Sequence, residues 1–172
     1  MLIYLNGTSS SGKTSMAVEL QKLIQKPTFY FSIDTLLQSL ANEDLEAIQG
    51  RKPYRQQLDW HSIFSGYFAS VASLVNEGNQ VIADCPVYNQ KLGELFNKFI
   101  KPLSRKIIVR IDCPLNTLEE RERNRGDRSL GIAKDQFKEI HSHIVNDLKI
   151  DTLKLTPAES ARHIFSYIEK LV

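Results

Sequence analysis

The sequence has 172 residues, a formal net charge of +2 at pH 7 and two cysteines. This length fits one domain whose core needs no disulfide. The small net charge gives no reason to expect a nucleic-acid partner, and no apolar run is long enough to span a membrane, so no membrane partner is expected either. Cys85 and Cys113 match no metal signature at their spacing, and a reduced, cytoplasmic setting is therefore expected.

The first half of the chain alternates between short apolar or aromatic runs and stretches of helical periodicity. Strands are predicted at residues 2–6, 28–32 and 81–84, and helices at 13–25, 33–40 and 60–76. Residues 42–57 are polar and are interrupted by glycine and proline, which predicts a mobile surface segment.

The second half continues the alternation. Helices are predicted at 88–103, 114–123 and 134–148, strands at 106–111 and 149–152, and a loop at 125–133. Thr156-Pro-Ala-Glu159 is a capping box with proline at the first helical position, and it opens a last helix that runs to residue 171.

Short, nearly all-apolar strands separated by helices are typical of a parallel sheet that is covered on both faces. The prediction is a three-layer α/β/α fold with a mostly parallel five-stranded sheet, forming a single domain over residues 1–172. In such sheets ligands bind beyond the carboxyl ends of the strands, so polar residues at those positions are the candidates for function.

Residues 7–14 match the phosphate-binding pattern G-x-x-x-x-G-K-[ST] between a predicted strand and a predicted helix. In such a loop backbone N–H groups face the phosphates, and the positive end of the helix dipole assists them. The lysine reaches the β- and γ-phosphates and the final hydroxyl binds Mg²⁺. The predicted nucleotide-binding residues are Gly7, Thr8, Ser9, Ser10, Ser11, Gly12, Lys13 and Thr14.

A phosphate loop alone does not distinguish ATPases, GTPases and kinases. A guanine-binding N-K-x-D motif is missing, since the Asn97-Lys98 pair is followed by Phe99 and Ile100 within a predicted helix. The chain is also too short for the added domains of most motor ATPases. A small kinase that uses ATP and Mg²⁺ remains.

Two aspartates follow predicted strands. Asp34 comes just after the second strand, on the side where an acceptor hydroxyl would lie, and it is the candidate general base. The structural alternative is that Ser32 or Asp34 caps the next helix. Asp84 ends the third strand, where nucleotide-binding enzymes place a carboxylate near Mg²⁺, and it is assigned to the metal with Thr14. Its alternative is a turn aspartate before Pro86.

Three arginines form the third candidate group. Arg121, Arg125 and Arg128 pass from a charged helix into a glycine-containing loop. Such a run is often only a solvated helix face, yet this is also where a closing lid would bring guanidinium groups to the phosphates. The lid is predicted at 125–133, with Arg125 and Arg128 assigned to catalysis and Arg121 to nucleotide binding.

In this order the motifs resemble the chloramphenicol phosphotransferase-like family of P-loop kinases. The matching pieces are Leu5-Asn6-Gly7 with SSSGKT, then F-S-I-D-T-L at 31–36, V-I-A-D at 81–84, R-G-D-R at 125–128 and Asp151-Thr152. The resemblance implies ATP-dependent phosphorylation of a small-molecule hydroxyl, as in self-protection against an antibiotic. It also implies that Asp34 is the general base.

The chain departs from the family pattern at two places that border the acceptor site. The family's insertion after the second strand is longer and glycine-rich, and its paired aspartates after the third strand appear here as Asp84-Cys85. The acceptor pocket is predicted between Asp34, the variable segment 35–60 and the turn at 84–87, with Tyr54 and Trp60 as lining candidates. For Trp60 the alternative is ordinary core packing.

Two other functions remain open. Arg51, Lys52 and Arg55 in the variable segment could hold an anionic acceptor, as in a nucleotide kinase or a toxin-like UDP-sugar kinase, although exposed loops carry such residues anyway. The third possibility is a nucleotide-binding regulator without an acceptor, for which a base at Asp34 would be unnecessary. The sequence leaves the acceptor and the oligomeric state open.

Overall fold

A computed structural model describes residues 1–125 and 130–171 of the chain. Five strands alternate with helices in the order β1, α1, β2, α2, α3, α4, β3, α5, β4, α6, α7, β5, α8. The strands are β1 (Leu2–Asn6), β2 (Thr28–Ser32), β3 (Gln80–Asp84), β4 (Lys106–Asp112) and β5 (Leu148–Asp151). The described helices are α1 (Lys13–Leu23), α2 (Ile33–Leu37), α3 (Asn42–Ile48), α4 (Trp60–Asn76), α5 (Gln90–Phe99), α6 (Leu115–Arg125), α7 (Ile132–Phe137) and α8 (Pro157–Glu169).

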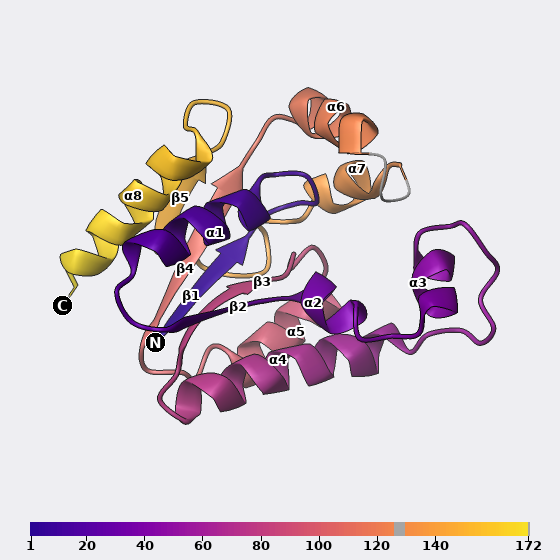
Figure 1. Ribbon diagram of the computed structural model, residues 1–172, viewed down its shortest axis with the longest axis horizontal. Coiled ribbons are helices and arrows are strands. Elements are labelled where there is room, and N and C mark those ends of the chain that lie inside the picture. Colours follow the sequence, from indigo (N-terminus) through magenta and orange to yellow (C-terminus); the bar gives the residue numbers. More distant parts are fainter. Residues whose placement is uncertain (126–129, 172) are drawn as a thin grey trace.

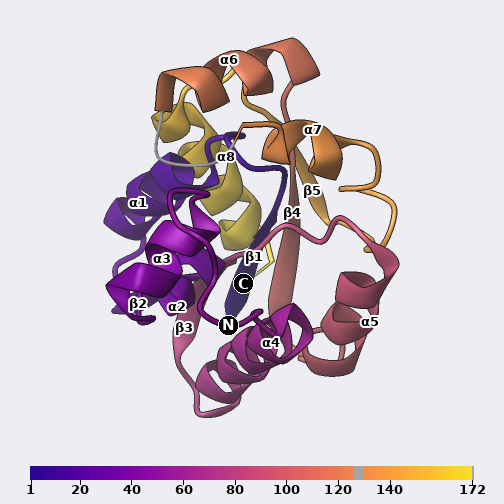
Figure 2. The same cartoon turned by 90° about the vertical axis from the view of Figure 1, so that its right-hand side faces the viewer.

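The sheet has the strand order β2-β3-β1-β4-β5, and every neighbouring pair is parallel. Helices α1 and α8 cover one face, and α4 and α5 cover the other (Figures 1 and 2). The predicted three-layer fold is confirmed. Because β1 lies between β3 and β4, the carboxyl end of β1 opens at the centre of the sheet edge, which is where an α/β sheet binds its ligand.

Each face of the sheet has its own hydrophobic core. On the α4 and α5 face, Tyr4 of β1 packs edge-on against Phe96, with ring centroids 5.0 Å apart. On the α1 and α8 face, Met16 and Leu20 pack with Ile164. Complete burial of such side chains stabilises the fold by about 1.5–3 kcal/mol each. Together the two cores hold the end of β1 rigidly in place.

The structure changes two parts of the prediction. The helix predicted at 134–148 is shorter: α7 ends at Phe137, and beyond it the Asn6 side chain donates a 2.7 Å hydrogen bond to the Ile140 carbonyl, which attaches this turn to β1. Within residues 42–57, predicted to be a mobile surface segment, Asn42–Ile48 forms α3. The predicted capping box at Thr156 is confirmed, with reciprocal bonds between Thr156 and Glu159.

Part of the predicted lid, including Gly126 and Arg128, lies outside the described residues. On its two sides, α6 extends to Arg125 and α7 begins at Ile132. None of the helices in the described ranges is both long enough and apolar enough to span a membrane.

Candidate active site

The phosphate loop joins β1 to α1 and needs unusual backbone angles. Gly12 has φ 91° and Ser10 has φ 62°, both in the left-handed region that glycine adopts readily. Gly7 is required for a different reason, because a Cβ atom there would lie 2.8 Å from both Ile111 Cβ and Ser11 Oγ. Tight packing against β4 therefore fixes the first glycine of the motif, and backbone conformation fixes the second.

Lys13 folds back over this loop. Its ammonium group donates to the carbonyl oxygens of Gly7 at 2.9 Å and Thr8 at 2.6 Å, and it lies 3.6 Å from Asp84 Oδ1. The side chains of Lys13 and Asp84 are both buried. A buried ammonium group is stable only with such partners, so the loop carries a preformed positive charge.

Two hydroxyls of the loop fit a phosphate ligand. Among the described residues, Ser9 Oγ and Ser10 Oγ are buried without a hydrogen-bond partner. Buried polar groups are normally paired, and each exception needs an explanation. Hydroxyl donors next to the Lys13 ammonium and the start of α1 supply what phosphate oxygens accept.

The two residues predicted to hold Mg²⁺ are bridged by a phenol that the sequence analysis missed. Tyr30 on β2 donates to Asp84 Oδ2 at 3.0 Å and lies 3.3 Å from Thr14 Oγ1. A hydroxyl and a carboxylate this close fit Mg²⁺, which prefers oxygen ligands and usually takes one or two carboxylates together with substrate phosphates. Burial and the Asp84 carboxylate raise the pKa of Tyr30, which keeps the phenol protonated as a donor.

Cys85 directly follows Asp84 at the carboxyl end of β3. It is fully buried, and burial followed by the charge of Asp84 raises the pKa of its thiol well above the ordinary value. A neutral thiol is a poor ligand for Mg²⁺. Asp84 is therefore the only one of this pair that offers a carboxylate.

Asp34 lies in the first turn of α2, at the edge of the same cavity as Lys13 and Thr14. The helix cap is Ser32, whose hydroxyl accepts the Thr35 N–H at 3.0 Å. Of the two capping alternatives, Ser32 is therefore correct. Asp34 has a half-buried side chain beside the phosphate loop, a position compatible with contact to an acceptor.

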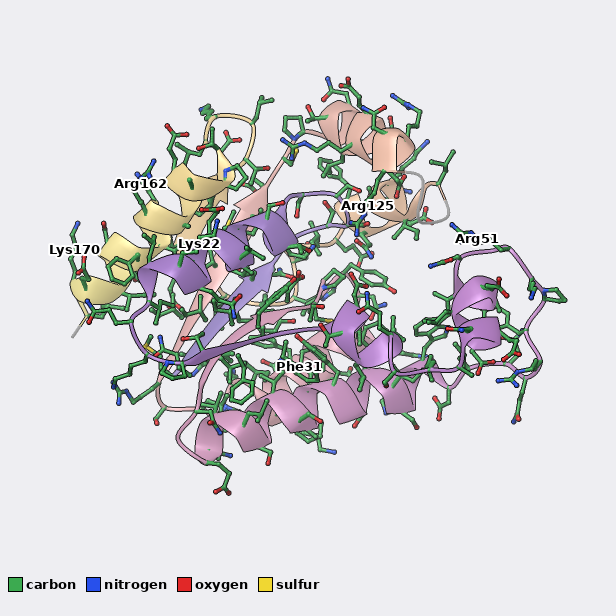
Figure 3. All side chains as sticks on the ribbon, in the orientation of Figure 1. Lys22, Phe31, Arg51, Arg125, Arg162 and Lys170 are labelled. Carbon is green, nitrogen blue, oxygen red and sulfur yellow. The ribbon has the colours of Figure 1, made fainter. Side chains whose placement is uncertain are left out.

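Of the three candidate arginines, the two that the structure describes, Arg121 and Arg125, both line the cavity. Arg121 donates to the Thr152 carbonyl at 3.1 Å and so ties α6 to the loop that follows β5. Arg125, at the last residue of α6, is exposed, and in Figure 3 it lies between α6 and the phosphate loop. Arg128 lies outside the described residues.

The cavity beside the phosphate loop has a volume of about 1470 Å³ and extends to both sides of it. We call its two parts the α8 side and the α4 side. The α8 side is lined by Arg121, Arg125, residues 152–157 and Ser160. The α4 side is lined by the apolar or aromatic residues Ile33, Leu37, Leu45, Ile48, Trp60, Phe64, Pro86, Tyr88, Leu92 and Leu95, and by the polar residues Ser32, Asp34, Thr35, Gln38, Gln49, His61, Asn89 and Lys91.

The predicted acceptor-side residues divide clearly. Trp60 lines the α4 side and packs on Phe64 with ring centroids 6.0 Å apart, whereas Tyr54 is absent from the described lining residues. The three basic residues of the variable segment are also absent from that lining. Lys52 pairs with Glu46 and Arg55 with Asp44, and Arg51 is exposed away from the sheet (Figure 3).

Three further residues were missed because they act through tertiary contacts. Tyr30 faces α1 because strand side chains alternate, which the pattern of β2 could have indicated. Gln136 Oε1 accepts the Ser9 N–H at 2.6 Å, and the buried Glu122 accepts two N–H groups at the start of α7. Nothing in the local sequence around the last two residues marks them.

Comparison with known proteins identifies similar chains. "Putative O-phosphotransferase Rv2636" of Mycobacterium tuberculosis is 26% identical and covers 95% of this chain and 80% of its own. A sugar kinase from Janibacter sp. has a TM-score of 0.70 at 13% identity, covering 98% of this chain and 94% of its own. The APS kinase CysC of Mycobacterium tuberculosis, solved with AMPPNP and APS, has a TM-score of 0.69 at 19% identity, with coverages of 98% and 96%.

The two solved structures are under one-fifth identical to this chain and establish the P-loop kinase fold. The family model for chloramphenicol phosphotransferase-like proteins matches residues 1–169, which is nearly the whole chain. The chain therefore belongs to the chloramphenicol phosphotransferase-like family and is a phosphotransferase.

Proposed function

We propose that the protein transfers the γ-phosphoryl group of ATP to a hydroxyl group of a small, uncharged and largely apolar molecule. One observation carries this proposal: a phosphate loop, a candidate base and an apolar cavity side meet at one edge of the sheet. The similar APS kinase was solved with AMPPNP, an ATP analogue, which supports ATP as the donor.

In this proposal ATP binds along the α8 side with its phosphates over residues 7–14. Arg121 and the residues after β5 border the base and ribose, and Arg125 approaches the phosphates from α6. Thr14 and Asp84 would hold Mg²⁺, which would supply positive charge to neutralise the phosphates. Lys13 moves from the Gly7 and Thr8 carbonyls to the β- and γ-phosphates. Arg128 is proposed to act beside Arg125 on sequence grounds alone.

The reaction needs one base. The acceptor oxygen forms a bond to the γ-phosphorus while the bond between that phosphorus and the β,γ-bridging oxygen breaks, and ADP leaves. The hydroxyl proton passes to the Asp34 carboxylate, which also orients the hydroxyl for attack. The transition state is loose, so positioning and charge stabilisation contribute most.

The lining of the α4 side favours an uncharged acceptor. Its polar members include one carboxylate, one lysine and one histidine, and no arginine occurs there among the described residues. An anionic acceptor such as a nucleotide or UDP-sugar is normally held by guanidinium groups that form paired hydrogen bonds. None of the three basic residues of the variable segment lines this side: Lys52 and Arg55 form ion pairs on the surface, and Arg51 is exposed.

The direct test is a screen for ADP release with ATP and Mg²⁺. Neutral aromatic or apolar alcohols, including hydroxyl-bearing antibiotics, are compared with sugars, nucleosides, nucleoside monophosphates and UDP-sugars. We expect stimulation by members of the first group and loss of that stimulation when EDTA removes Mg²⁺. Mass spectrometry of the product should show the mass of one added phosphoryl group.

Two outcomes would contradict the proposal. Stimulation confined to nucleoside monophosphates or UDP-sugars would support the nucleotide-type alternative. A protein that binds ATP tightly but transfers phosphate to none of the alcohols would support the regulator alternative, as would ATP binding that is unchanged in Asp34→Asn when no acceptor is found. A control reaction with the same protein concentration and ATP but no acceptor gives the baseline rate of ADP release by slow ATP hydrolysis.

A further inference from the structure

The peptide group between Thr8 and Ser9 is held at both of its polar atoms. The Thr8 carbonyl oxygen accepts from Lys13 Nζ at 2.6 Å and from Ser11 Oγ at 2.8 Å. On the other side, the Ser9 N–H donates to Gln136 Oε1 at 2.6 Å. Gln136 belongs to α7, is 8% exposed, and lies 127 positions away in the sequence. The Thr8–Ser9 peptide group is thus held both by residues of the loop itself and by a helix that is distant in the sequence.

Nucleotide binding would affect the hydrogen bond from Lys13 to Thr8 and the hydrogen bond from Ser9 to Gln136 differently. In the proposed function Lys13 turns toward the phosphates, and the Thr8 carbonyl then loses its charged partner. Ser10, which follows Ser9, has a φ of 62°, a left-handed conformation that is disfavoured for a residue other than glycine, so this part of the loop needs contacts that hold it in place. A rotation would turn backbone N–H groups away from the phosphates. Two contacts of this peptide group do not depend on Lys13: the Ser11 hydroxyl still donates to the Thr8 carbonyl within the loop, and the Ser9 N–H still donates to Gln136, which is the one that comes from outside the loop.

Helix α7 is in turn fixed to the arginine-bearing helix. Glu122 of α6 is buried, and its carboxylate accepts the Gly131 N–H at 2.7 Å and the Ala133 N–H at 3.0 Å. Hydrogen bonds to a charged acceptor are roughly twice as strong as neutral ones. Arg121 and Arg125 flank Glu122 on α6 and both line the cavity. A continuous path therefore runs from the phosphate loop through Gln136, α7 and Glu122 to the arginines.

We propose that Gln136 is a positioning residue for the phosphate loop. Glu122 links α7, the helix that carries Gln136, to α6. Gln136 keeps the Thr8–Ser9 peptide oriented when Lys13 moves to the phosphates. Because Gln136 and the arginines belong to linked helices, the binding of nucleotide and the placement of Arg121 and Arg125 depend on each other. This inference rests on nucleotide binding at the phosphate loop.

The first experiment replaces Gln136 with methionine, which has similar length but no acceptor for the buried N–H. We expect affinity for ADP and AMPPNP, measured by calorimetry with Mg²⁺, to fall about tenfold, since a buried N–H left unpaired is costly. NMR should show faster hydrogen exchange of the Ser9 amide. Gln136→Glu retains an acceptor oxygen and should restore slow exchange of that amide, which a general loss of packing would not predict.

The second experiment tests the path to α6 with Glu122→Gln and the double variant. If both residues act along one path, their effects on AMPPNP affinity should not add. The Kd of the double variant should then be no more than about twofold above that of the single variant that binds AMPPNP less tightly. In wild type, AMPPNP should slow hydrogen exchange in residues 115–125, and Gln136→Met should reduce that protection. Ile164→Val, a core change in α8, is the control that lowers stability without weakening nucleotide binding.

The outcomes separate this inference from the proposed function. If wild type binds neither ADP nor AMPPNP, the proposed function fails first. If wild type binds them and Gln136→Met binds equally well, or if the two single effects multiply fully in the double variant, the positioning role is wrong. Slow Ser9 exchange in Gln136→Met would also overturn it.

Discussion

The phosphate loop and the segment at 38–59 border the same cavity but are held in opposite ways. The loop is buried and is bonded to residues distant in sequence, such as Gln136, while Gly7 packs against Ile111. The segment carries exposed ion pairs between near neighbours, such as Lys52 with Glu46 at 2.6 Å. Exposed pairs of this kind contribute about 0–1 kcal/mol.

This difference indicates how the two tasks of the enzyme are distributed. Phosphate binding depends on backbone geometry that the whole sheet enforces, so it tolerates little change. The proposed acceptor side includes α3 and its flanking turns, which project from the body of the molecule in Figure 1 and contact it less. A surface held by local contacts can vary without loss of the fold.

The largest expected effect is at the loop. Lys13→Ala removes the ammonium group that is proposed to reach the phosphates, and it takes an ion-pair partner from the buried Asp84. We expect loss of transfer to background together with weaker binding of AMPPNP, measured by coupled ADP assay and calorimetry. Normal turnover in this variant would mean that the loop assignment is wrong.

The second largest effect is expected at Asp34 and should lower turnover without changing ATP affinity. Asp34→Asn keeps the side-chain shape and the Ser32 cap of α2 but removes the proton acceptor. Turnover should fall by about 10²–10⁴-fold, as is typical for a general base. Affinity for ATP should stay near that of wild type, as measured by calorimetry. A variant that cannot bind ATP would instead show that Asp34 has a structural role.

The third effect lies on the α4 side of the cavity. Trp60→Ala removes an aromatic wall that packs on Phe64. The KM for the acceptor should rise roughly ten- to hundredfold, since truncating a central aromatic contact commonly costs about 2 kcal/mol or more. The KM for ATP should be unchanged. Trp60→Phe is the matched control and should recover most of the affinity, and equal changes in both KM values would contradict a role confined to the acceptor.

The smallest effect is expected from the exposed ion pairs. A double variant, Lys52→Ala with Arg55→Ala, removes both basic partners of the surface pairs. Stability should change by no more than about 1 kcal/mol in urea unfolding, and the acceptor KM should change less than about twofold. A large rise in that KM would show that these residues do hold an anionic acceptor, and the comparison between the two regions would then fail.

The sequence by itself determined most of the architecture. Alternating apolar runs and helical periodicity placed all five strands within about two residues, and α4 was predicted with the bounds observed. The phosphate loop was recognisable because its glycines, lysine and threonine must be adjacent in the chain to form one backbone cradle. Local signals also gave the capping box at Thr156, since its two partners lie three residues apart.

Only the tertiary structure decided what depends on partners far apart in the chain. The turn after α7, where the sequence predicted a continued helix, is attached to β1 by the bond from Asn6 to the Ile140 carbonyl. The bonds of Tyr30 to Asp84 and of Gln136 to Ser9 likewise join residues 54 and 127 positions apart. A local pattern reports the period of one element and the chemistry of adjacent residues. Contacts such as these exist only after parallel strands bring their carboxyl ends to the same edge of the sheet, so no stretch of sequence records them.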